Sequence, residues 1–215
     1  MNLQMNKPFF SIIIPAYNAE NHIRKLLDSI KQKTFTNYEL IVVCDNCTDD
    51  TESIAKSYGA RTDTVSFGLD GLTRDHGIAM ATGSWILFAD DDDWFMDDTA
   101  FHQIYDVAIH DLCIDLVAFG YMFQSKGYKA PTGHELFTPR IAHVWSKAWR
   151  RDTIGDARFG NAVFCSDTYF LKAMNPRVSK IATIDKPLYY YNFLRPGSQT
   201  DLFVQGKIRQ SPVAQ

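Results

Sequence analysis

Long apolar runs and an excess of positive charge are both missing from this chain of 215 residues. No segment approaches the roughly 20 apolar residues that a membrane-spanning helix requires, and Met1 to Pro8 lacks the apolar core of a signal peptide. The net charge of −3 argues against nucleic acid as a partner, because binding to a phosphate backbone needs a basic surface. With 46% hydrophobic residues, the composition predicts one soluble domain in a reducing, cytoplasmic setting.

Cysteine is also scarce, and only two of the four cysteines stand close together. Cys44 and Cys47 form a C-x-x-C pair between an expected strand and an expected helix, the placement found in thioredoxin-like redox sites. A zinc site would need a second pair, but Cys113 and Cys165 are isolated in the sequence. The acidic residue inside the pair raises a thiol pKa and disfavours the reactive thiolate. We interpret the pair as two small residues on a tight turn.

Four consecutive carboxylates, Asp90 to Asp93, follow directly after the apolar stretch Trp85 to Ala89. That stretch predicts a short buried strand, so the acidic residues come at its C-terminal end, where open α/β sheets bind ligands. Like charges repel one another, and a folded protein keeps them together when positive charge is near. Mg²⁺ or Mn²⁺, held by carboxylates and substrate phosphates, would supply that charge. The alternative is a solvated turn that caps a helix beginning near Asp97.

The first half of the chain alternates apolar strands with segments whose apolar residues recur at helical spacing. Strands are expected at Phe9 to Ile14, Leu40 to Val43, Thr62 to Phe67, Trp85 to Ala89 and Leu116 to Phe123. Helices are expected at Asn21 to Lys33, at a segment carrying Ile54 and Tyr58, at Thr73 to Ala81, and at a segment carrying Phe101 and Ala108. This order predicts an α/β fold with a mainly parallel sheet and right-handed crossovers.

The second half has a different character. Lys126 to Pro139 is polar and contains glycine and proline, which predicts a loop. A strongly aromatic region follows, and the residues after Gly206 show no clear periodicity. We found no internal repeat, low-complexity tract or heptad pattern.

Several segments, in the same order, resemble the motifs of family 2 glycosyltransferases of the GT-A type. The acidic run matches the Asp-x-Asp metal motif of that family, and the resemblance extends from about Ser11 to Thr200. The other matching segments are Ser11–Asn18, Val42–Asp49, Gly71–Gly83, Val144–Lys147, Ser166–Phe170 and Tyr189–Asn192. The resemblance implies a Rossmann-like α/β sheet with helices on both faces and a smaller mixed region on the acceptor side.

The resemblance also implies a function. We expect metal-dependent, inverting transfer of a sugar from a nucleoside-diphosphate sugar, with UDP as the expected nucleotide, to a hydroxyl of a glycan or lipid-linked acceptor. Mn²⁺ or Mg²⁺ is the expected cofactor, and peripheral association with the inner face of a membrane is a further expectation. Within a single domain of residues 1–215, we assign 9–124 to the donor, 125–200 to the acceptor and catalysis, and 201–215 to a tail.

The motif positions imply a role for individual residues. Asp92 is the expected metal ligand and Asp167 the expected general base, while Trp145 and Lys147 are candidates for the acceptor site. The expected donor-binding residues are Pro15, Tyr17, Asn18, Asp45, Arg74, Asp90, Asp91 and Arg195.

Structural alternatives stand beside four of these assignments. Asp45 could only shape its turn, Asp167 could be an N-cap, Trp145 could belong to the core, and Arg195 could lie in a surface loop. For the neighbouring Asp49, we favour helix capping over binding.

The chain departs from the family motifs at several positions. Cys44 stands where the family usually has an Asp that reads the base, and a thiol is a poor acceptor. Cys47 stands at a position that is usually Ser, and Asp75 replaces the usual Asn. Ser166 replaces the Glu that usually precedes the catalytic Asp. The thiol of Cys44 leaves open which base the donor carries, and Ser166 leaves open how Asp167 is oriented and how its pKa is set.

Two other functions fit parts of the pattern. A nucleotidyltransferase also combines an α/β sheet with carboxylate-bound Mg²⁺, but it would have a glycine-rich phosphate loop where this chain has Pro15 to Asn18. A non-catalytic module that binds a nucleotide sugar would not need both the acidic run and Asp167. We therefore favour the glycosyltransferase.

Overall fold

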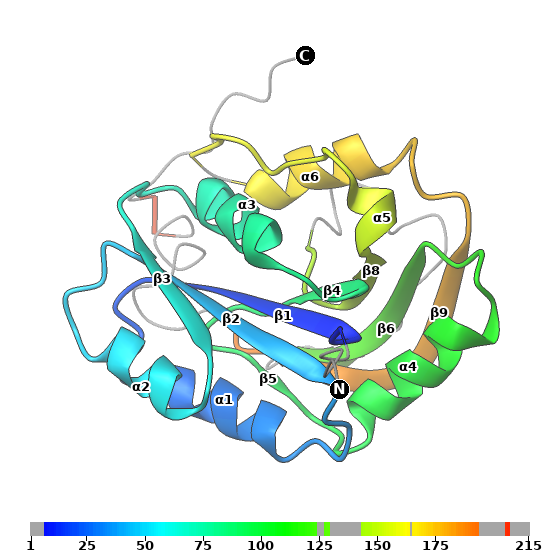
Figure 1. The fold of residues 1–215 in the computed structure, drawn as a ribbon, viewed down its shortest axis with the longest axis horizontal. Helices are drawn as coiled ribbons and strands as arrows, with labels where there is room; N and C mark the ends of the chain where they lie inside the picture. The colour runs from blue at the N-terminus through cyan, green and yellow to red at the C-terminus, as the bar shows by residue number, and fades with distance from the viewer. Residues whose placement is uncertain (1–6, 124–126, 130–142, 164, 194–204, 207–215) are drawn as a thin grey trace, which may run out of the picture.

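The computed structural model describes residues 7–123, 127–129, 143–163, 165–193 and 205–206. One mixed sheet forms the centre of the molecule, with helices on both of its faces (Figure 1). The strands lie in the order β3-β2-β1-β4-β8-β6-β9-β5, and β7 pairs with β6 outside this path. The predicted α/β class with helices on both faces is confirmed. None of the described helices combines the length and apolar character needed to cross a membrane.

The parallel part of the sheet comes from the first half of the chain. Its strands are β1 (Phe10–Ala16), β2 (Tyr38–Asp45), β3 (Arg61–Val65) and β4 (Trp85–Phe88). Strand β1 pairs in parallel with both β2 and β4, and β2 pairs in parallel with β3. Because the carboxyl ends of parallel strands meet at one edge of a sheet, the turn after β1 lies beside the turns after β2 and β4.

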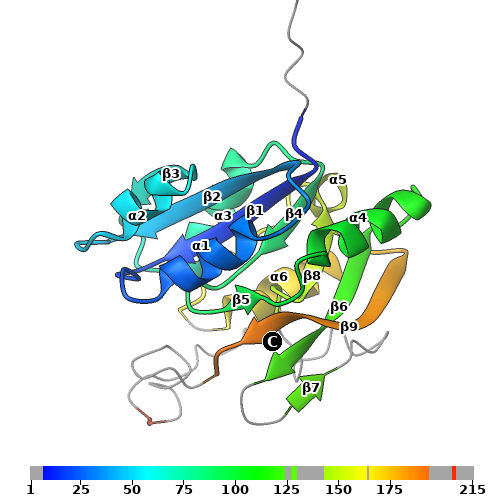
Figure 2. The same ribbon diagram turned by 90° about the horizontal axis from the view of Figure 1, so that it is seen from below.

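The chain from residue 94 onward adds the mixed part of the sheet. It contains β5 (Trp94–Phe95), β6 (Leu116–Phe123), β7 (Gly127–Lys129), β8 (Lys147–Arg150) and β9 (Ile181–Tyr191). Strand β8 pairs antiparallel with both β4 and β6, whereas β9 runs parallel to β6 (Figure 2). Strand β7 falls within the predicted loop of Lys126 to Pro139, so that prediction is wrong for residues 127–129. Residues 130–139 lie outside the described residues.

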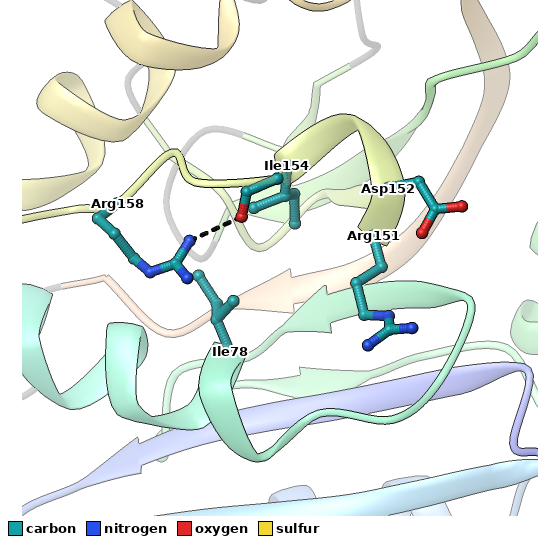
Figure 3. Close-up of a pocket in the computed structure, with 6 residues that line it drawn as sticks. Ile78, Arg151, Asp152, Ile154 and Arg158 are labelled. Atoms are coloured by element: carbon teal, nitrogen blue, oxygen red, sulfur yellow. Dashed lines mark hydrogen bonds between the residues drawn. The ribbon is translucent and has the colours of Figure 1, made fainter.

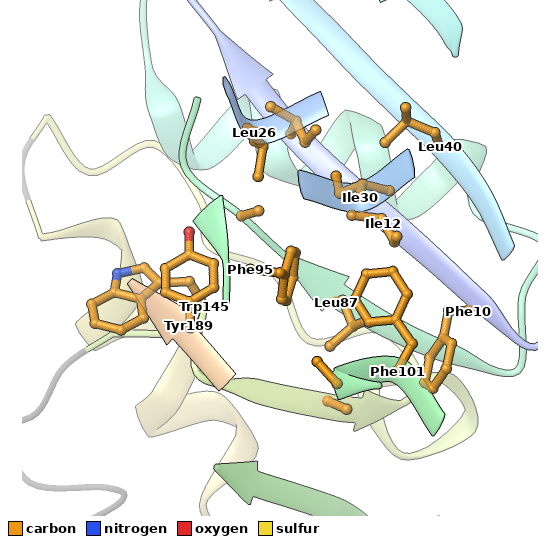
Figure 4. Close-up of a cluster of buried hydrophobic side chains, with 14 of the residues drawn as sticks. Phe10, Ile12, Leu26, Ile30, Leu40, Leu87, Phe95, Phe101, Trp145 and Tyr189 are labelled. Carbon is orange, nitrogen blue, oxygen red and sulfur yellow. The ribbon is translucent and has the colours of Figure 1, made fainter. Parts of the chain in front are cut away.

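Each face of the sheet has its own hydrophobic core because neighbouring strand residues point to opposite sides. Phe10, Ile12 and Ile14 of β1 pack on the side of α1, α2 and α4, and Ile13 packs on the side of α3, α5 and α6. Figure 4 shows the first core, in which Leu26 and Ile30 of α1 lie over the sheet near Ile12. Each fully buried side chain of this size contributes about 1.5–3 kcal/mol to folding.

Of the six helices in the described residues, four fall close to the segments that the apolar spacing predicts. Four follow strands of the first half, and two belong to the second half. They are α1 (Ile23–Lys31), α2 (Thr51–Ser57), α3 (Asp70–Met80), α4 (Ala100–His110), α5 (Arg151–Ile154) and α6 (Ser166–Met174). Helix α3 begins three residues earlier than predicted, and this first turn contains Asp70.

Candidate functional site

The acidic turn, residues Asp90 to Asp93, begins two residues after β4 ends. The amide of Asp93 donates to the carbonyl of Asp90 at 3.1 Å and closes the turn, while the amide of Asp90 donates to the hydroxyl of Tyr189. The carboxylates leave the turn toward different partners. Because Asp90, Asp91 and Asp93 each have a separate partner, the repulsion among the four is reduced.

Asp91 fastens the acidic turn to the turn after β1. One carboxylate oxygen lies 3.1 Å from Nε2 of His22, and the other accepts the amide of Tyr17 at 3.4 Å. Asp93 turns inward instead, where it accepts the amide of Asn192 at 2.8 Å. Burial raises the pKa of Asp93 well above its ordinary value, which favours the neutral carboxyl and removes one charge from the cluster.

Arg74 supplies positive charge beside the acidic turn. Its buried guanidinium donates to Asp70 one helical turn earlier, and it contacts Asp90 at 2.5 Å and Asp167 at 3.7 Å. Burial lowers the pKa of Arg74, but the three carboxylates outweigh burial and raise it above its ordinary value. The arginine therefore stays charged and joins the acidic turn to α6.

Asp167 lies in the first turn of α6, at the edge of the buried cluster around Arg74. The helix N-cap is Cys165, so the alternative that made Asp167 an N-cap does not hold. One carboxylate oxygen of Asp167 accepts the amide of Val144 at 3.1 Å. Burial raises the pKa of Asp167 to about 6, while Arg74 opposes that shift. A carboxylate with this pKa is ionised at neutral pH and able to take a proton.

Asp90 carries a similar perturbation. Burial raises its pKa to about 7, and the contact with Arg74 acts in the opposite direction. Asp92 is partly exposed beside it. Two neighbouring carboxylates fit a divalent ion whose remaining ligands are substrate phosphates, the usual arrangement for Mg²⁺. Within the described ranges no three His, Cys, Asp or Glu side chains converge as a metal cluster, so protein ligands alone do not form a cage here.

Lys147 is fully buried on β8, close to the same cluster. Its ammonium donates to the carbonyl of His143 at 2.7 Å and lies 3.2 Å from Nδ1 of that residue. Burial lowers the pKa of Lys147 to about 7, although the charge of Asp167 acts to raise it. Its assignment to the acceptor site stays a prediction.

Trp145 lies inside an aromatic cluster, with an exposed fraction of 4%. Its ring stacks on Tyr189 at 5.0 Å and on His143 at 4.0 Å, and Figure 4 shows Trp145 and Tyr189 lying against each other. A sugar would need an exposed ring face. The structure therefore favours the core alternative for Trp145.

The turn after β1 presents the predicted base-binding residues at the edge of the sheet. Tyr17 is 64% exposed, and Pro15 lies within β1 beside Val43 of β2, because the strand continues to Ala16. Asn18 has a positive φ of 46°, and its side-chain oxygen accepts the amide of Thr48 at 2.8 Å. These residues remain candidates for binding the nucleotide. Arg195 lies outside the described residues.

Asp45 is buried at the end of β2, and its oxygens are already used. It accepts the amides of Phe67 and Gly68 at 2.8 and 3.0 Å and the hydroxyl of Thr73 at 2.9 Å. These contacts favour the alternative in which Asp45 shapes its turn. Asp49 accepts the amide of Thr51 at 3.0 Å at the start of α2, although the N-cap residue of that helix is its neighbour Asp50.

The cysteine pair lies beneath the turn after β1. The thiol of Cys47 donates to the carbonyl of Ala16 at 3.3 Å and accepts the amide of Asn18 at 3.4 Å. A hydrogen bond between the thiols raises the pKa of Cys44 and lowers that of Cys47, so the expectation of a disfavoured thiolate is wrong for Cys47. Both cysteines are free thiols.

Asp75, which replaces the Asn of the family motif, has a structural role. Its oxygens accept the amides of Phe159 and Gly160 at 2.8 and 3.0 Å. It therefore holds the segment before α6 against α3.

A pocket of about 400 Å³ lies elsewhere, beside the C-terminal part of α3 (Figure 3). Arg151 and Arg158 lie on either side of Ile78 and Ile154, and Arg158 donates to the carbonyl of Gly155 at 3.0 Å. None of the predicted site residues lines it.

Sequence reasoning missed several residues that shape the site. Asp70 could have been found from its spacing of four residues to Arg74 on one helix. His22 has no such local signal, since it acquires its role through a contact with Asp91 in a distant segment. His143 contacts Lys147 only four residues away, and Tyr189 belongs to a segment that resembles the family motifs.

Solved structures share this fold. The crystal structure of S. aureus TarS 1–349 in complex with UDP-GlcNAc superposes with a TM-score of 0.77 at 22% identity, over 89% of this chain and 60% of that chain. The mannosyltransferase PcManGT from Pyrobaculum calidifontis, in complex with GDP-Man and Mn²⁺, gives a TM-score of 0.68 at 14% identity, over 90% of this chain and 59% of that chain.

Curated sequences give a consistent assignment. The uncharacterized glycosyltransferase EpsJ of Bacillus subtilis is 28% identical over 91% of this chain and 64% of its own length. The glycosyltransferase GlyA of Streptococcus pneumoniae is 24% identical over 91% of this chain, which spans only 32% of GlyA. Residues 11–173 match the sequence model of glycosyl transferase family 2. The chain belongs to that family.

Proposed function

We propose that this chain transfers a sugar from a nucleoside-diphosphate sugar to a hydroxyl group of a glycan or lipid-linked acceptor, with inversion at the anomeric carbon. The observation that carries the proposal is the position of Arg74, which contacts both Asp90 of the acidic turn and Asp167 of α6. One buried side chain thus joins the carboxylates expected to face the donor with the expected base. Residues 9–124 would bind the donor, and residues 125–200 the acceptor.

Asp167 is the proposed general base. An acceptor hydroxyl is a weak nucleophile until its proton is removed during attack. The carboxylate of Asp167 is held by the amide of Val144, and its pKa of about 6 suits proton transfer near neutral pH. The proton leaves the acceptor as the new glycosidic bond forms and the bond to the diphosphate breaks.

Asp92 is the proposed ligand of Mn²⁺ or Mg²⁺. When bound, such an ion neutralises the charge that develops on the leaving diphosphate. Asp90 would face the ribose or the ion, and Asp91 would hold the turn after β1 against the acidic turn through Tyr17 and His22.

We propose a UDP-sugar as donor. The relative TarS has been crystallised with UDP-GlcNAc, whereas the mannosyltransferase PcManGT has been crystallised with GDP-Man. In this chain, the internal bonds of Asp45 and the thiol of Cys44 leave base recognition to Tyr17 and to backbone groups of the turn after β1.

A nucleotide-release assay tests the proposal. The chain is incubated with UDP-GlcNAc, UDP-glucose or GDP-mannose, with Mn²⁺ or with a chelator, and with a panel of glycan acceptors. We expect one UDP-sugar to yield UDP in the presence of Mn²⁺, through transfer or slow hydrolysis, and the chelator to abolish this reaction. In a parallel incubation with UTP and a sugar 1-phosphate, release of pyrophosphate would indicate a nucleotidyltransferase. Tight donor binding without turnover across the panel would indicate a binding module.

A lipid-linked acceptor would bring the protein to the inner face of a membrane. Flotation with vesicles that contain an undecaprenyl-type phospholipid tests this part of the proposal. We expect the protein to float with these vesicles and not with vesicles of neutral phospholipid. Equal recovery in both cases would contradict it.

A further inference from the structure

The first turn of α3 lies so close to Ser166 of α6, and to the segment before that helix, that only glycine fits at position 71. A Cβ atom at Gly71 would lie 2.5 Å from the carbonyl oxygen of Gly160, 3.0 Å from Cβ of Ser166 and 3.1 Å from Cβ of Phe159. A separation of 2.5 Å from a backbone oxygen cannot be relieved by a side-chain rotation. The first turns of the two helices are thereby held face to face.

Asp70 and Ser166 meet at this contact. The buried hydroxyl of Ser166 donates to a carboxylate oxygen of Asp70 at 2.9 Å, and the same oxygen accepts from Nη1 of Arg74. Nη1 of Arg74 also lies 3.7 Å from Asp167, and Nη2 donates to Asp90. Asp70 therefore binds one edge of the Arg74 guanidinium. The other edge of the guanidinium binds Asp90 of the acidic turn.

We propose that Asp70, held by Ser166, is a positioning residue for the transfer reaction, which fixes Arg74 between Asp90 and Asp167 and keeps Asp167 able to accept a proton. This inference rests on the proposed function, and it adds a residue that the family motifs do not contain at this position. Ser166 stands where the family motif has Glu. Asp70 of α3 thus supplies a carboxylate in place of the Glu that α6 lacks at position 166.

The charges around Asp167 determine whether loss of the Asp70 charge raises or lowers the pKa of Asp167. From α3, Arg74 lowers the pKa of Asp167 and Asp70 raises it; from β8, Lys147 lowers it. Asp90 of the acidic turn also faces this cluster, and the charge of Asp167 raises the pKa of Asp90. Loss of the charge at Asp70 removes a repulsion and releases Arg74 toward Asp167. Both changes make the carboxylate of Asp167 a weaker base.

An ordinary helix pair would behave differently. A surface ion pair with this spacing contributes little to stability, because water and salt screen its charges. Glu52 and Lys56 of α2 form such a pair at 2.9 Å, with exposed fractions of 36% and 60%. Glu52→Gln is therefore the matched control for Asp70→Asn, since each removes one carboxylate charge from an i, i+4 pair.

The experiment compares the pH profiles of kcat for wild type, Asp70→Asn, Glu52→Gln and the exchange variant Asp70→Asn with Ser166→Glu. In Asp70→Asn, we expect the acid limb to move down by about one pH unit and the plateau to fall about threefold to tenfold, as a weaker base requires. The exchange variant should restore the position of the acid limb and the height of the plateau. The pH profile of Glu52→Gln should resemble that of wild type.

A second measurement does not depend on turnover. The carboxyl ¹³C titration of Asp167, followed by NMR, should show a lower pKa in Asp70→Asn, so the inference is tested even if no donor supports transfer and the proposed function fails. Should Asp70→Asn not fold, Ser166→Ala removes only the hydroxyl and should lower the same pKa by a smaller amount. An unchanged Asp167 titration in a folded variant would overturn the inference, as would an exchange variant that folds but restores nothing.

Discussion

The ammonium of Lys147 donates to the carbonyl of His143 at 2.7 Å, within a fully buried environment. A neutral acceptor does not offset the loss of water around a charged amine. Burial consequently lowers the pKa of Lys147 to about 7, against an ordinary value of 10.5.

This contact predicts a pH-dependent stability. Between pH 7 and 10.5, the unfolded chain binds a proton at Lys147 that the folded chain does not bind, so the free energy of unfolding rises with pH through this window. We expect Lys147→Met to be more stable than wild type at pH 7, by a margin that shrinks by at most about 1.4 kcal/mol per pH unit as pH rises. Urea denaturation at pH 7, 8 and 9 measures the margin. A margin that stays constant would contradict the prediction.

Asp92→Asn should abolish metal-assisted binding of the diphosphate and leave the fold intact. The substitution removes a hard carboxylate ligand, while the crowded acidic turn loses one repelling charge. Calorimetry with UDP, with and without Mn²⁺, measures the effect. Asp156→Asn, which alters a carboxylate that is 89% exposed, serves as control. Metal-dependent affinity equal to that of wild type would exclude Asp92 as the ligand.

Asp167→Asn should retain donor binding and lose transfer by on the order of a hundredfold or more, because an amide of the same shape cannot accept a proton. In the wild type, activity should fall as pH drops through about 6, where the carboxylate becomes protonated. The residual activity of Asp167→Asn should not show this fall at acidic pH. Near-normal turnover in a folded variant would assign the base elsewhere.

Cys44→Ser combined with Cys47→Ser should retain most activity, and the activity should not depend on reductant. Serine at position 47 can still donate to Ala16 and accept from Asn18, as the thiol does. Enzyme assays with and without dithiothreitol, together with zinc analysis, test this. Cys113→Ser, at an exposed position, is the control. Zinc in the wild type that disappears in the variant would show that the turn interpretation is wrong.

Local patterns predicted the elements well where one face of an element is apolar. Strand β6 has the predicted bounds, and α1 differs from the prediction by two residues at each end, because burial of Ile23, Leu26 and Ile30 on one side requires a helix. Strand β9 gave no such signal, since it contains Pro187 and changes register against β6 near Gly120.

The site was harder to predict because a motif fixes residue types and not their partners. The acidic turn could be recognised from its position after a predicted strand, and Arg74 from its place in a segment that resembles the family motifs. The inward orientation of Asp93 and the internal bonds of Asp45 depend on segments that are distant in the sequence. Trp145 shows the same limit, because an aromatic residue suits a core and a sugar-binding surface equally well.

The bonds from the acidic turn to β9 have a consequence for synthesis on the ribosome. Tyr189 follows Asp90 by 99 residues, and Asn192 follows Asp93 by 99 residues. During translation at about 5–20 residues per second, the amide of Asp90 and the carboxylate of Asp93 therefore remain without these partners for several seconds. Contacts between such distant residues are also slow to form in refolding. We expect the parallel strands to assemble first, with the acidic turn as one of the last parts of the molecule to become ordered.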